Sequence, residues 1–346
     1  MAKKPAPTTN LTDPMFSDEA LARAHFESIR WEGGVPVCFH CGVVGDAVAV
    51  KRDEKRAAAK MKDENKKLRK IARDGLYFCR ACGGQFTATM GTVYEDSHIP
   101  LNKWMLATHL MNSCKRGVSA AELQRQLGLG SYRTAWFMAM RIREGMGVDK
   151  NGDPIGGPGK IVEADETYFG DVAEPRTTTT RGRPFTKKGN TGPANKRAVV
   201  ALVERGGSAR IIHVGTADKE TLAALIQKHV DPASRLHTDE SRIYRGADAF
   251  TASHETVKHS AGEYARGDVN TNSAEGVFSQ FKRGMFGVYG HCHEKYLAMY
   301  LKEFEFRHNN RVKLGIDDKE RAARAVKGTV GKRLTLRMPK GQQASA

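Results

Sequence analysis

The spacing of apolar residues changes near residue 160. Before that point, apolar positions recur at helical spacing, as in "PLNKWMLATHLMN", where Leu101, Trp104 and Met105 share one face. After it, apolar residues fall in short runs of strand length, the longest being Ala198–Val203. The pattern predicts a largely helical first part and an α/β second part.

The second part alternates predicted strands and helices. The "RGGS" after residue 204 predicts a hairpin, and Asp218 is expected to cap the helix "KETLAALIQKHV". Three sequential strands, then alternating helix and strand, then helices predict an α/β layer with a mixed sheet. The predicted strands are 160–165, 197–204, 209–214, "RLHT" ending at Asp239, and "ETVKH", and the later helices are 272–284 and 293–310.

The first part contains a pair of short helices beside a glycine turn. The segment "VSAAELQRQLG" and a helix starting at Ser131 flank the turn Gly128–Gly130. Such a pair is typical of a helix-turn-helix, although many helical hairpins bind no nucleic acid. Nearer the N-terminus, Ser17 is expected to cap another short helix.

The charge balance adds a partner class. A net charge of +17 favours polyanions, of which nucleic acid is the commonest. Residues 51–73 hold eleven Lys/Arg and predict a charged helix, either a solvated arm or a grip on phosphates. No run approaches the ~20 apolar residues of a membrane-spanning helix, and the N-terminus lacks the apolar core of a secretory signal. We expect a soluble, cytoplasmic protein that does not bind membranes.

Four of the six cysteines form two C-x-x-C pairs. Cys38 with Cys41, and Cys79 with Cys82, can supply four thiolates to one structural zinc ion. A glycine follows each pair and permits a tight turn. The 37 residues between the pairs exceed the usual spacing, and the basic insert accounts for the excess. His40 lies inside a pair and is left out of the predicted ligand set.

Three carboxylates lie at the ends of predicted elements in the α/β part. Asp165 lies in the first strand, Asp239 ends a later strand, and Glu275 lies early in the helix "NSAEGVFSQFKRG". Each has an ordinary alternative, as a solvated strand end, a helix cap or a partner of the helix dipole. Together they would repel one another unless divalent cations offset their charge, and hard oxygen ligands suit Mg²⁺ or Mn²⁺.

With these residues in place, the chain resembles bacterial insertion-sequence transposases of the DDE type, in the group with an N-terminal zinc ribbon and a ribonuclease-H-like catalytic domain. The resemblance covers roughly residues 20–312, and the insert 51–73 departs from the short ribbon of that group. It is carried by "CFHCG…YFCRACGGQFTATMGTVYEDSHIPLNKW", "VEADETYFG", "AVVALVERGG", "HTDESRIY" and "VNTNSAEGVFSQFKRGMFGVYGHCHEKYLAMYLKEFEFRHNNR".

The resemblance implies a DNA transposase with Asp165, Asp239 and Glu275 as its acidic triad. Two Mg²⁺ or Mn²⁺ ions would serve end cleavage and strand transfer, with Asp165 bridging both ions. Glu166 is a rival ligand that should point to the other side of a regular strand. The partners would be double-stranded DNA, as element terminal repeats and target, and a second subunit in a homodimer or larger synaptic assembly near the bacterial nucleoid.

The implied DNA contacts are basic. The loop 176–197 and the residues after Glu275 would hold phosphates, and the ribbon and the helix pair would read sequence. The candidates are Lys282, Arg283, Arg307 and Arg311 for phosphates, and Arg125 and Arg133 for the helix pair. His237, His259 and the cluster His291, Cys292 and His293 have no assigned role, and the cluster is better explained as a loop before a helix than as a second metal site.

The sequence is thus predicted to divide into six segments. They are a disordered tail 1–16, a zinc ribbon 17–98 with its basic insert 51–73, a helix-turn-helix-like region 99–148, a linker 149–159, a ribonuclease-H-like domain 160–312 and a basic C-terminal tail 313–346, expected to be loose from residue 319. Two other functions remain open: a DNA-binding regulator that has lost catalysis, and a metal-dependent nuclease that cuts without joining.

Overall fold

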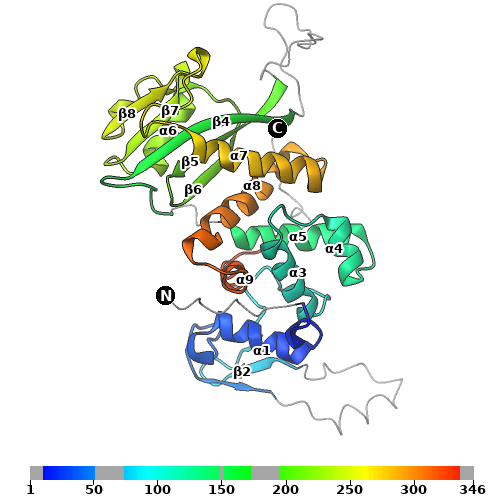
Figure 1. Ribbon diagram of the computed structural model, residues 1–346. Helices are drawn as coiled ribbons and strands as arrows, with labels where there is room; N and C mark the ends of the chain where they lie inside the picture. Colours follow the sequence, from blue (N-terminus) through cyan, green and yellow to red (C-terminus); the bar gives the residue numbers. More distant parts are fainter. Residues whose placement is uncertain (1–10, 51–73, 148–151, 173–194, 336–346) are drawn as a thin grey trace, which may run out of the picture. The chain divides into compact units, whose positions relative to one another are not determined.

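The computed structural model describes residues 11–50, 74–147, 152–172 and 195–335 (Figure 1). The expectations for the insert 51–73, for most of the loop 176–197 and for residues 149–151 of the linker lie outside these residues. By its internal contacts the chain divides into two compact units, unit 1 with residues 1–113, 123–145 and 318–346, and unit 2 with residues 114–122 and 146–317. The segment boundaries predicted from the sequence stay a prediction.

Unit 1 combines helices with a small antiparallel sheet. Its strand order is β1-β2-β3, and the rings of Trp31 and Tyr77 meet edge to face with centroids 5.1 Å apart beside it. The elements are η1 (Pro14–Phe16), α1 (Glu19–Arg30), η2 (Glu32–Gly34), β1 (Ala47–Ala49), β2 (Leu76–Cys79), β3 (Gln85–Thr87), α3 (Leu101–Ser113), α5 (Tyr132–Met146) and α9 (Asp318–Lys327), with α4 (Ala120–Leu127) divided between the units at residue 123.

The cap of α1 corrects one expectation. Asp18, not Ser17, caps the helix: its carboxylate accepts hydrogen bonds from the backbone of Ala20 at 2.7 Å and of Leu21 at 2.9 Å. The Ser17 hydroxyl instead donates to the Pro14 carbonyl at 3.2 Å. Both side chains are good caps by type, and the η1 turn in front of the helix shifts the cap by one residue.

The predicted helix pair is present. A turn at Gly128, with φ 58°, separates α4 from α5, and the Ser131 hydroxyl accepts a hydrogen bond from the Thr134 amide at 3.1 Å at the start of α5. The buried Leu123 and Leu127 of α4 form its inner face.

The C-terminal region departs from the loose tail expected from residue 319. Residues Asp318–Lys327 form α9, which contacts α1 and α3. Ala325 and Val326 are buried, and the Arg321 guanidinium donates to the Asn112 carbonyl at 2.8 Å. A basic helix is thus held by a narrow apolar stripe and one buried arginine, whose stem packs as an apolar group.

Unit 2 is built on a five-stranded mixed sheet of order β6-β5-β4-β7-β8. β4 runs antiparallel to β5 and parallel to β7, so the first strand lies at the centre. The strands are β4 (Ile161–Asp171), β5 (Lys196–Glu204), β6 (Ala209–Val214), β7 (Arg235–Asp239) and β8 (Ser253–Val257). The predicted mixed sheet and hairpin are confirmed, and the arrangement is ribonuclease-H-like; β4 extends beyond the predicted 160–165 because it stays paired with β5 up to Asp171.

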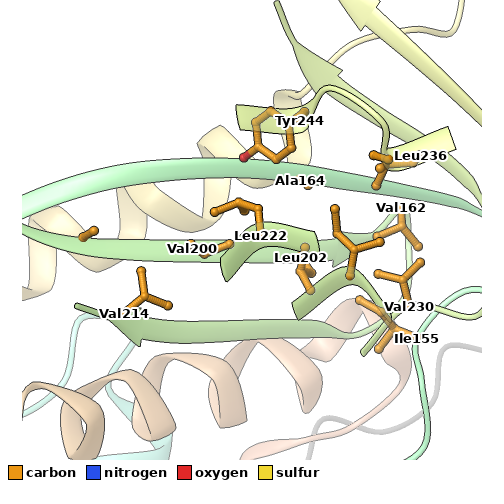
Figure 2. Close-up of a cluster of buried hydrophobic side chains, with 13 residues drawn as sticks. Ile155, Val162, Ala164, Val200, Leu202, Val214, Leu222, Val230, Leu236 and Tyr244 are labelled. Atoms are coloured by element: carbon orange, nitrogen blue, oxygen red, sulfur yellow. The ribbon is translucent and has the colours of Figure 1, made fainter. Parts of the chain in front are cut away.

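Helices lie on both faces of this sheet (Figure 1). Val162 and Ala164 of β4 join a buried cluster with Leu222 of α6 and Tyr244 on one face (Figure 2). On the other face Phe169 of β4 meets Phe281 of α7 with ring centroids 5.2 Å apart. The remaining elements are α6 (Lys219–His229), η4 (Arg242–Tyr244), η5 (Ala247–Ala249), η6 (His259–Ala261), α7 (Asn272–Gly284), the π-helical turn η7 (Met285–Tyr289), α8 (Glu294–Asn309) and η8 (Val312–Leu314).

Candidate active site and metal centre

The parallel pairing of β4 and β7 brings two of the predicted acids together. The last residue pair in this ladder is Glu163 with His237. Asp165 and Asp239 each lie two residues further along, so they reach the same level on adjacent strands and point to the same face. Asp239 ends its strand and accepts a hydrogen bond from the Ser241 amide at 3.0 Å.

Glu275 comes from α7, which covers that face. The helix packs on β4 and β5 through Ala274, Phe278 and Phe281, as the apolar spacing predicts. Glu275 lies in the first turn and is exposed, and its carboxylate accepts a hydrogen bond from the Thr271 hydroxyl at 3.3 Å. The helix thus presents this acid at the end that begins beside β4.

The electrostatics of Asp165 reflect these neighbours. Burial raises its pKa to about 7, and the negative charges of Glu166, Asp239 and Glu275 act in the same direction, against a hydrogen bond from the Glu166 amide. A carboxyl group at the centre of a sheet is costly to ionise without a cation beside it. Within the described part of the chain, no lysine or arginine forms an ion pair with any of the three predicted acids.

The donor set fits hard divalent cations. The oxygens of the three acids do not all lie within 4.8 Å of one another, a limit that only the four cysteines meet among the described residues. In a site for two ions ~4 Å apart, each with ligands ~2 Å away, the two outer carboxylates belong to different ions and need not approach so closely. A single-ion site for all three would demand a tighter group.

Glu163 lies beside the candidate site, and sequence reasoning gave it no role. Its side chain is fully buried on the Asp165 face of β4, and its carboxylate accepts hydrogen bonds from the backbone of Ser273 and Ala274 in α7. The available signal was its position: an acid two residues from Asp165, inside an apolar strand, needs a partner.

The basic candidates separate into two groups. Arg283 on α7 is exposed and Lys282 is half-buried. Arg307 is almost buried, paired with the buried Glu303, and its guanidinium lies over the Phe304 ring. Arg311 donates to the carbonyls of Gly207 and His308. The expectation of phosphate contacts from Arg307 and Arg311 stays a prediction, and both guanidinium groups already make contacts within the fold.

The helix pair keeps its candidates. Arg125 at the end of α4 and Arg133 at the start of α5 are both exposed. Their side chains are therefore available to a partner.

The unassigned histidines do not build a second metal site among the described residues. His237 is fully buried, and burial lowers its pKa, as do the charges of Arg205 and Arg235. The His259 ring lies against Tyr264 with centroids 5.5 Å apart. The cluster His291, Cys292 and His293 forms the loop before α8, as expected.

The four cysteines of unit 1 lie together and could hold a metal ion. Their sulfur atoms all lie within 4.8 Å of one another, with 3.7 Å from Cys38 to Cys82 and from Cys41 to Cys79. Gly42, with φ 72°, closes one turn through a hydrogen bond of its amide to the Cys38 carbonyl at 2.9 Å. That left-handed conformation favours glycine.

The thiols of this group differ in acidity. Burial raises the pKa of Cys38, but hydrogen bonds from the backbone amides of Cys41 and His40 outweigh it and lower that pKa to about 6, whereas burial and the neighbouring thiols raise the pKa of Cys41 to about 12. The His40 ring is hydrogen-bonded to the Gln85 carbonyl at 3.0 Å, which agrees with leaving it out of the ligand set. Four sulfur ligands with no open position match structural zinc.

The α/β unit has a recognisable class. Residues 156–309, which include its mixed sheet and the helix that covers it, match the family described as the ISXO2-like transposase domain. This match bears out the prediction of an insertion-sequence transposase, a phosphoryl-transfer enzyme.

Relatives agree with this class. The chain is 29% identical over 238 residues to the "Uncharacterized protein in transposable element ISH50" of Halobacterium salinarum, covering 67% of this chain and 77% of that protein. Two Mos1 transposase structures are more distant: the pre-cleavage transpososome (12% identity, TM-score 0.23, 62% of this chain and 75% of that one) and the paired-end complex with left transposon end (14%, 0.24, 79% and 82%).

One further property concerns membranes. No helix in the described ranges is long and apolar enough to cross a bilayer.

Proposed function

We propose that this transposase cleaves the ends of its element and joins them to target DNA at a site formed by Asp165, Asp239 and Glu275. The observation that carries the proposal is the register of the adjacent parallel strands β4 and β7, which would bring Asp165 and Asp239 to one level on the face that α7 covers with Glu275. The raised pKa of Asp165 supports it, because burial and three neighbouring acids leave that carboxylate in need of a cation.

The residues have distinct tasks. Asp165, at the centre of the sheet, would hold both of two Mg²⁺ or Mn²⁺ ions, while Asp239 and Glu275 would each hold one. Such a pair of ions supplies charge that activates a water or a 3′-hydroxyl and stabilises the leaving oxygen of an in-line displacement. The rigid strands fix Asp165 and Asp239, so little reorganisation accompanies the reaction. No serine or cysteine nucleophile is required.

DNA would contact both units. Lys282 and Arg283 lie in the last turn of α7, the helix that carries Glu275, and would hold phosphates next to the reacting bond. Arg133 and Arg125 on the helix pair would read the terminal repeats, as base contacts do in helix-turn-helix proteins. The net charge of +17 supports strong, salt-sensitive binding to the phosphate backbone.

One Zn²⁺ held by Cys38, Cys41, Cys79 and Cys82 would have a structural task. The small sheet β1-β2-β3 is too short to be stable alone, and metal binding to four thiolates supplies the missing folding free energy. A homodimer or larger assembly follows from the reaction, because two element ends are processed together.

An assay of strand transfer tests the proposal. The full chain is incubated with a labelled element-end fragment, target DNA and Mg²⁺. We expect both a nicked end and a joined product, and neither with Asp165→Asn. Cleavage without joining would support the nuclease alternative, and binding without cleavage would support the regulator alternative.

A further inference from the structure

The buried acid Glu163 connects the strand of Asp165 to the helix of Glu275. Glu163 and Asp165 lie two residues apart on β4 and therefore point to the same face. The Glu163 side chain has no exposed surface, although an ionised carboxylate in that position needs several favourable contacts to be retained. Its contacts identify what it does there.

Glu163 acts as the cap of α7. Its carboxylate accepts hydrogen bonds from the Ser273 amide at 2.6 Å, the Ala274 amide at 3.1 Å and the Ser273 hydroxyl at 3.0 Å. The residue that precedes the helix, Thr271, makes no capping hydrogen bond of its own. The second and third amides of the helix are the ones that a normal cap satisfies, and a negative charge there is favoured by the helix dipole.

Arg205 fixes the other side of the same carboxylate. Its guanidinium donates to Glu163 at 2.8 Å, to the Asp268 carbonyl at 2.8 Å and to the Asn270 side chain at 3.2 Å. The residues before α7 are therefore held by the same arginine that pairs with Glu163. The Glu163 carboxylate is therefore bonded both to Arg205 and to the start of α7. These bonds fix the first turn of α7 relative to β4.

We propose that Glu163 is a positioning residue that sets the place of the Glu275 carboxylate relative to Asp165. Glu275 follows Ala274 directly, so the two amides bound by Glu163 belong to the turn that carries Glu275. Glu163 is two residues from Asp165 on the same strand, β4. Three hydrogen bonds connect the Glu163 carboxylate to that turn of α7. Protein groups alone thus place Asp165 and Glu275 relative to each other before any ion binds. This inference rests on the proposed two-ion site and deepens it.

The expected consequence is a change in metal binding. Mutation of a residue that orients a metal ligand typically lowers metal affinity or activity by about 10- to 100-fold. Glu163→Gln keeps the shape and one acceptor but loses the charge, so we expect the Mg²⁺ concentration for half-maximal cleavage to rise about tenfold. Glu163→Ala should shift it further, towards about 100-fold. Ser273→Ala, which removes one hydrogen bond, should give a smaller shift in the same direction.

The experiment combines that titration with direct binding of Mn²⁺, followed by electron paramagnetic resonance of the full-length protein. DNA affinity without metal is measured in parallel and should not change. The matched control is Glu255→Gln: Glu255 pairs with Arg235 at 2.8 Å in the same unit but forms no hydrogen bond or ion pair with α7 among the described residues. A role limited to general stability would lower the melting temperature of Glu163→Gln and of the control alike, and would leave Mn²⁺ affinity unchanged.

The outcomes separate this inference from the function it rests on. If Asp165→Asn loses Mn²⁺ binding while Glu163→Gln and Ser273→Ala bind Mn²⁺ like the parent, the positioning role is wrong and the two-ion site stands. If Asp165→Asn binds Mn²⁺ as well as the parent does, the two-ion site is wrong and this inference fails with it. If Glu163→Ala does not fold, as judged by circular dichroism, the two milder variants decide.

Discussion

The hydroxyl of Tyr244 donates a hydrogen bond of 2.8 Å to the carboxylate of Glu166, the residue next to Asp165. Tyr244 belongs to the apolar cluster on the α6 face of the sheet, so Glu166 points away from the face shared by Asp165 and α7 (Figure 2). Burial raises the pKa of Glu166, whereas the Tyr244 hydrogen bond lowers it. The hydrogen bond from Tyr244 thus holds Glu166 on the opposite face of the sheet, away from the acids on the Asp165 face.

This relationship predicts different results for two adjacent acids. Glu166→Gln keeps an acceptor for the Tyr244 hydroxyl and removes no proposed metal ligand, so we expect cleavage to fall by no more than about tenfold, the lower range for groups behind a metal site. Asp165→Asn should leave no measurable cleavage. Single-turnover rates on a labelled element end check this. Equal loss of activity in both variants would make Glu166 a ligand and the assignment incomplete.

The other two acids give a second prediction. Asp239→Asn and Glu275→Gln should each lower the cleavage rate by at least about 10²- to 10³-fold, as the loss of one charge-stabilising group does. DNA affinity should stay the same or rise slightly, because each change removes a negative charge facing phosphates. Cleavage rates and binding by fluorescence anisotropy are measured on the same protein samples. Normal turnover by Asp239→Asn would contradict the proposed site.

Most of the α/β fold could be predicted from patterns among residues close together in the sequence. The buried positions of α7, such as Val277 and Phe281, follow helical spacing, and the hairpin of β5 and β6 follows from two apolar runs with a glycine turn between them. The acidic candidates followed from their places at element ends. These features depend on neighbours a few residues apart, which is the range that a sequence pattern records.

Contacts between distant residues were not predictable in the same way. Glu163 and Ser273 are 110 positions apart, and nothing local indicates that they meet. Arg307 reads as a solvated helix residue, yet its partner Glu303 is buried, so the pair lies inside the fold. Charged residues in buried pairs follow the tertiary arrangement rather than their own polarity, and both surprises are of this kind.

The raised pKa of Asp165 predicts how pH changes stability. Below about pH 3 the carboxyl is protonated in the folded and unfolded chain alike. As the pH rises towards the folded pKa of about 7, the unfolded chain loses this proton first, so the folded state is progressively penalised, up to about 4 kcal/mol above pH 7 at 1.36 kcal/mol per pKa unit.

Asp165→Asn should therefore be more stable than the parent at pH 8, and the difference should shrink as the pH falls to 5. Added Mg²⁺ should stabilise the parent, since an ion bound only by the folded state raises stability, and should have little effect on the variant. Calorimetric melting in buffers without added divalent ions, then with Mg²⁺, measures both effects. A variant that melts below the parent at pH 8 would speak against an unpaired charge at Asp165.

The cysteine centre gives a prediction about unit 1. Cys79 is fully buried in the four-sulfur group, and Cys79→Ser should lose zinc and unfold the small sheet, because metal binding and folding are coupled in such sites. Cys114→Ser is the control, since Cys114 lies outside the group. Zinc per chain by elemental analysis, together with circular dichroism, reports the result. Unchanged zinc content in Cys79→Ser would refute the ligand assignment.

The start of α5 offers the sharpest test of how element ends are recognised. Arg133 is exposed there, and a base contact from it would be worth about 1–3 kcal/mol for the correct sequence and nothing for other sequences. Arg133→Ala should then weaken binding to an element end by about 5- to 150-fold and leave binding to unrelated DNA unchanged. If Arg133 contacts a phosphate instead, binding to both DNAs should weaken equally and the salt slope should fall by about 0.9.

Arg324→Ala is the control. It removes the same charge from the exposed side of α9 and should change neither affinity. Equal binding of Arg133→Ala and Arg324→Ala to the element end would remove Arg133 from the recognition surface.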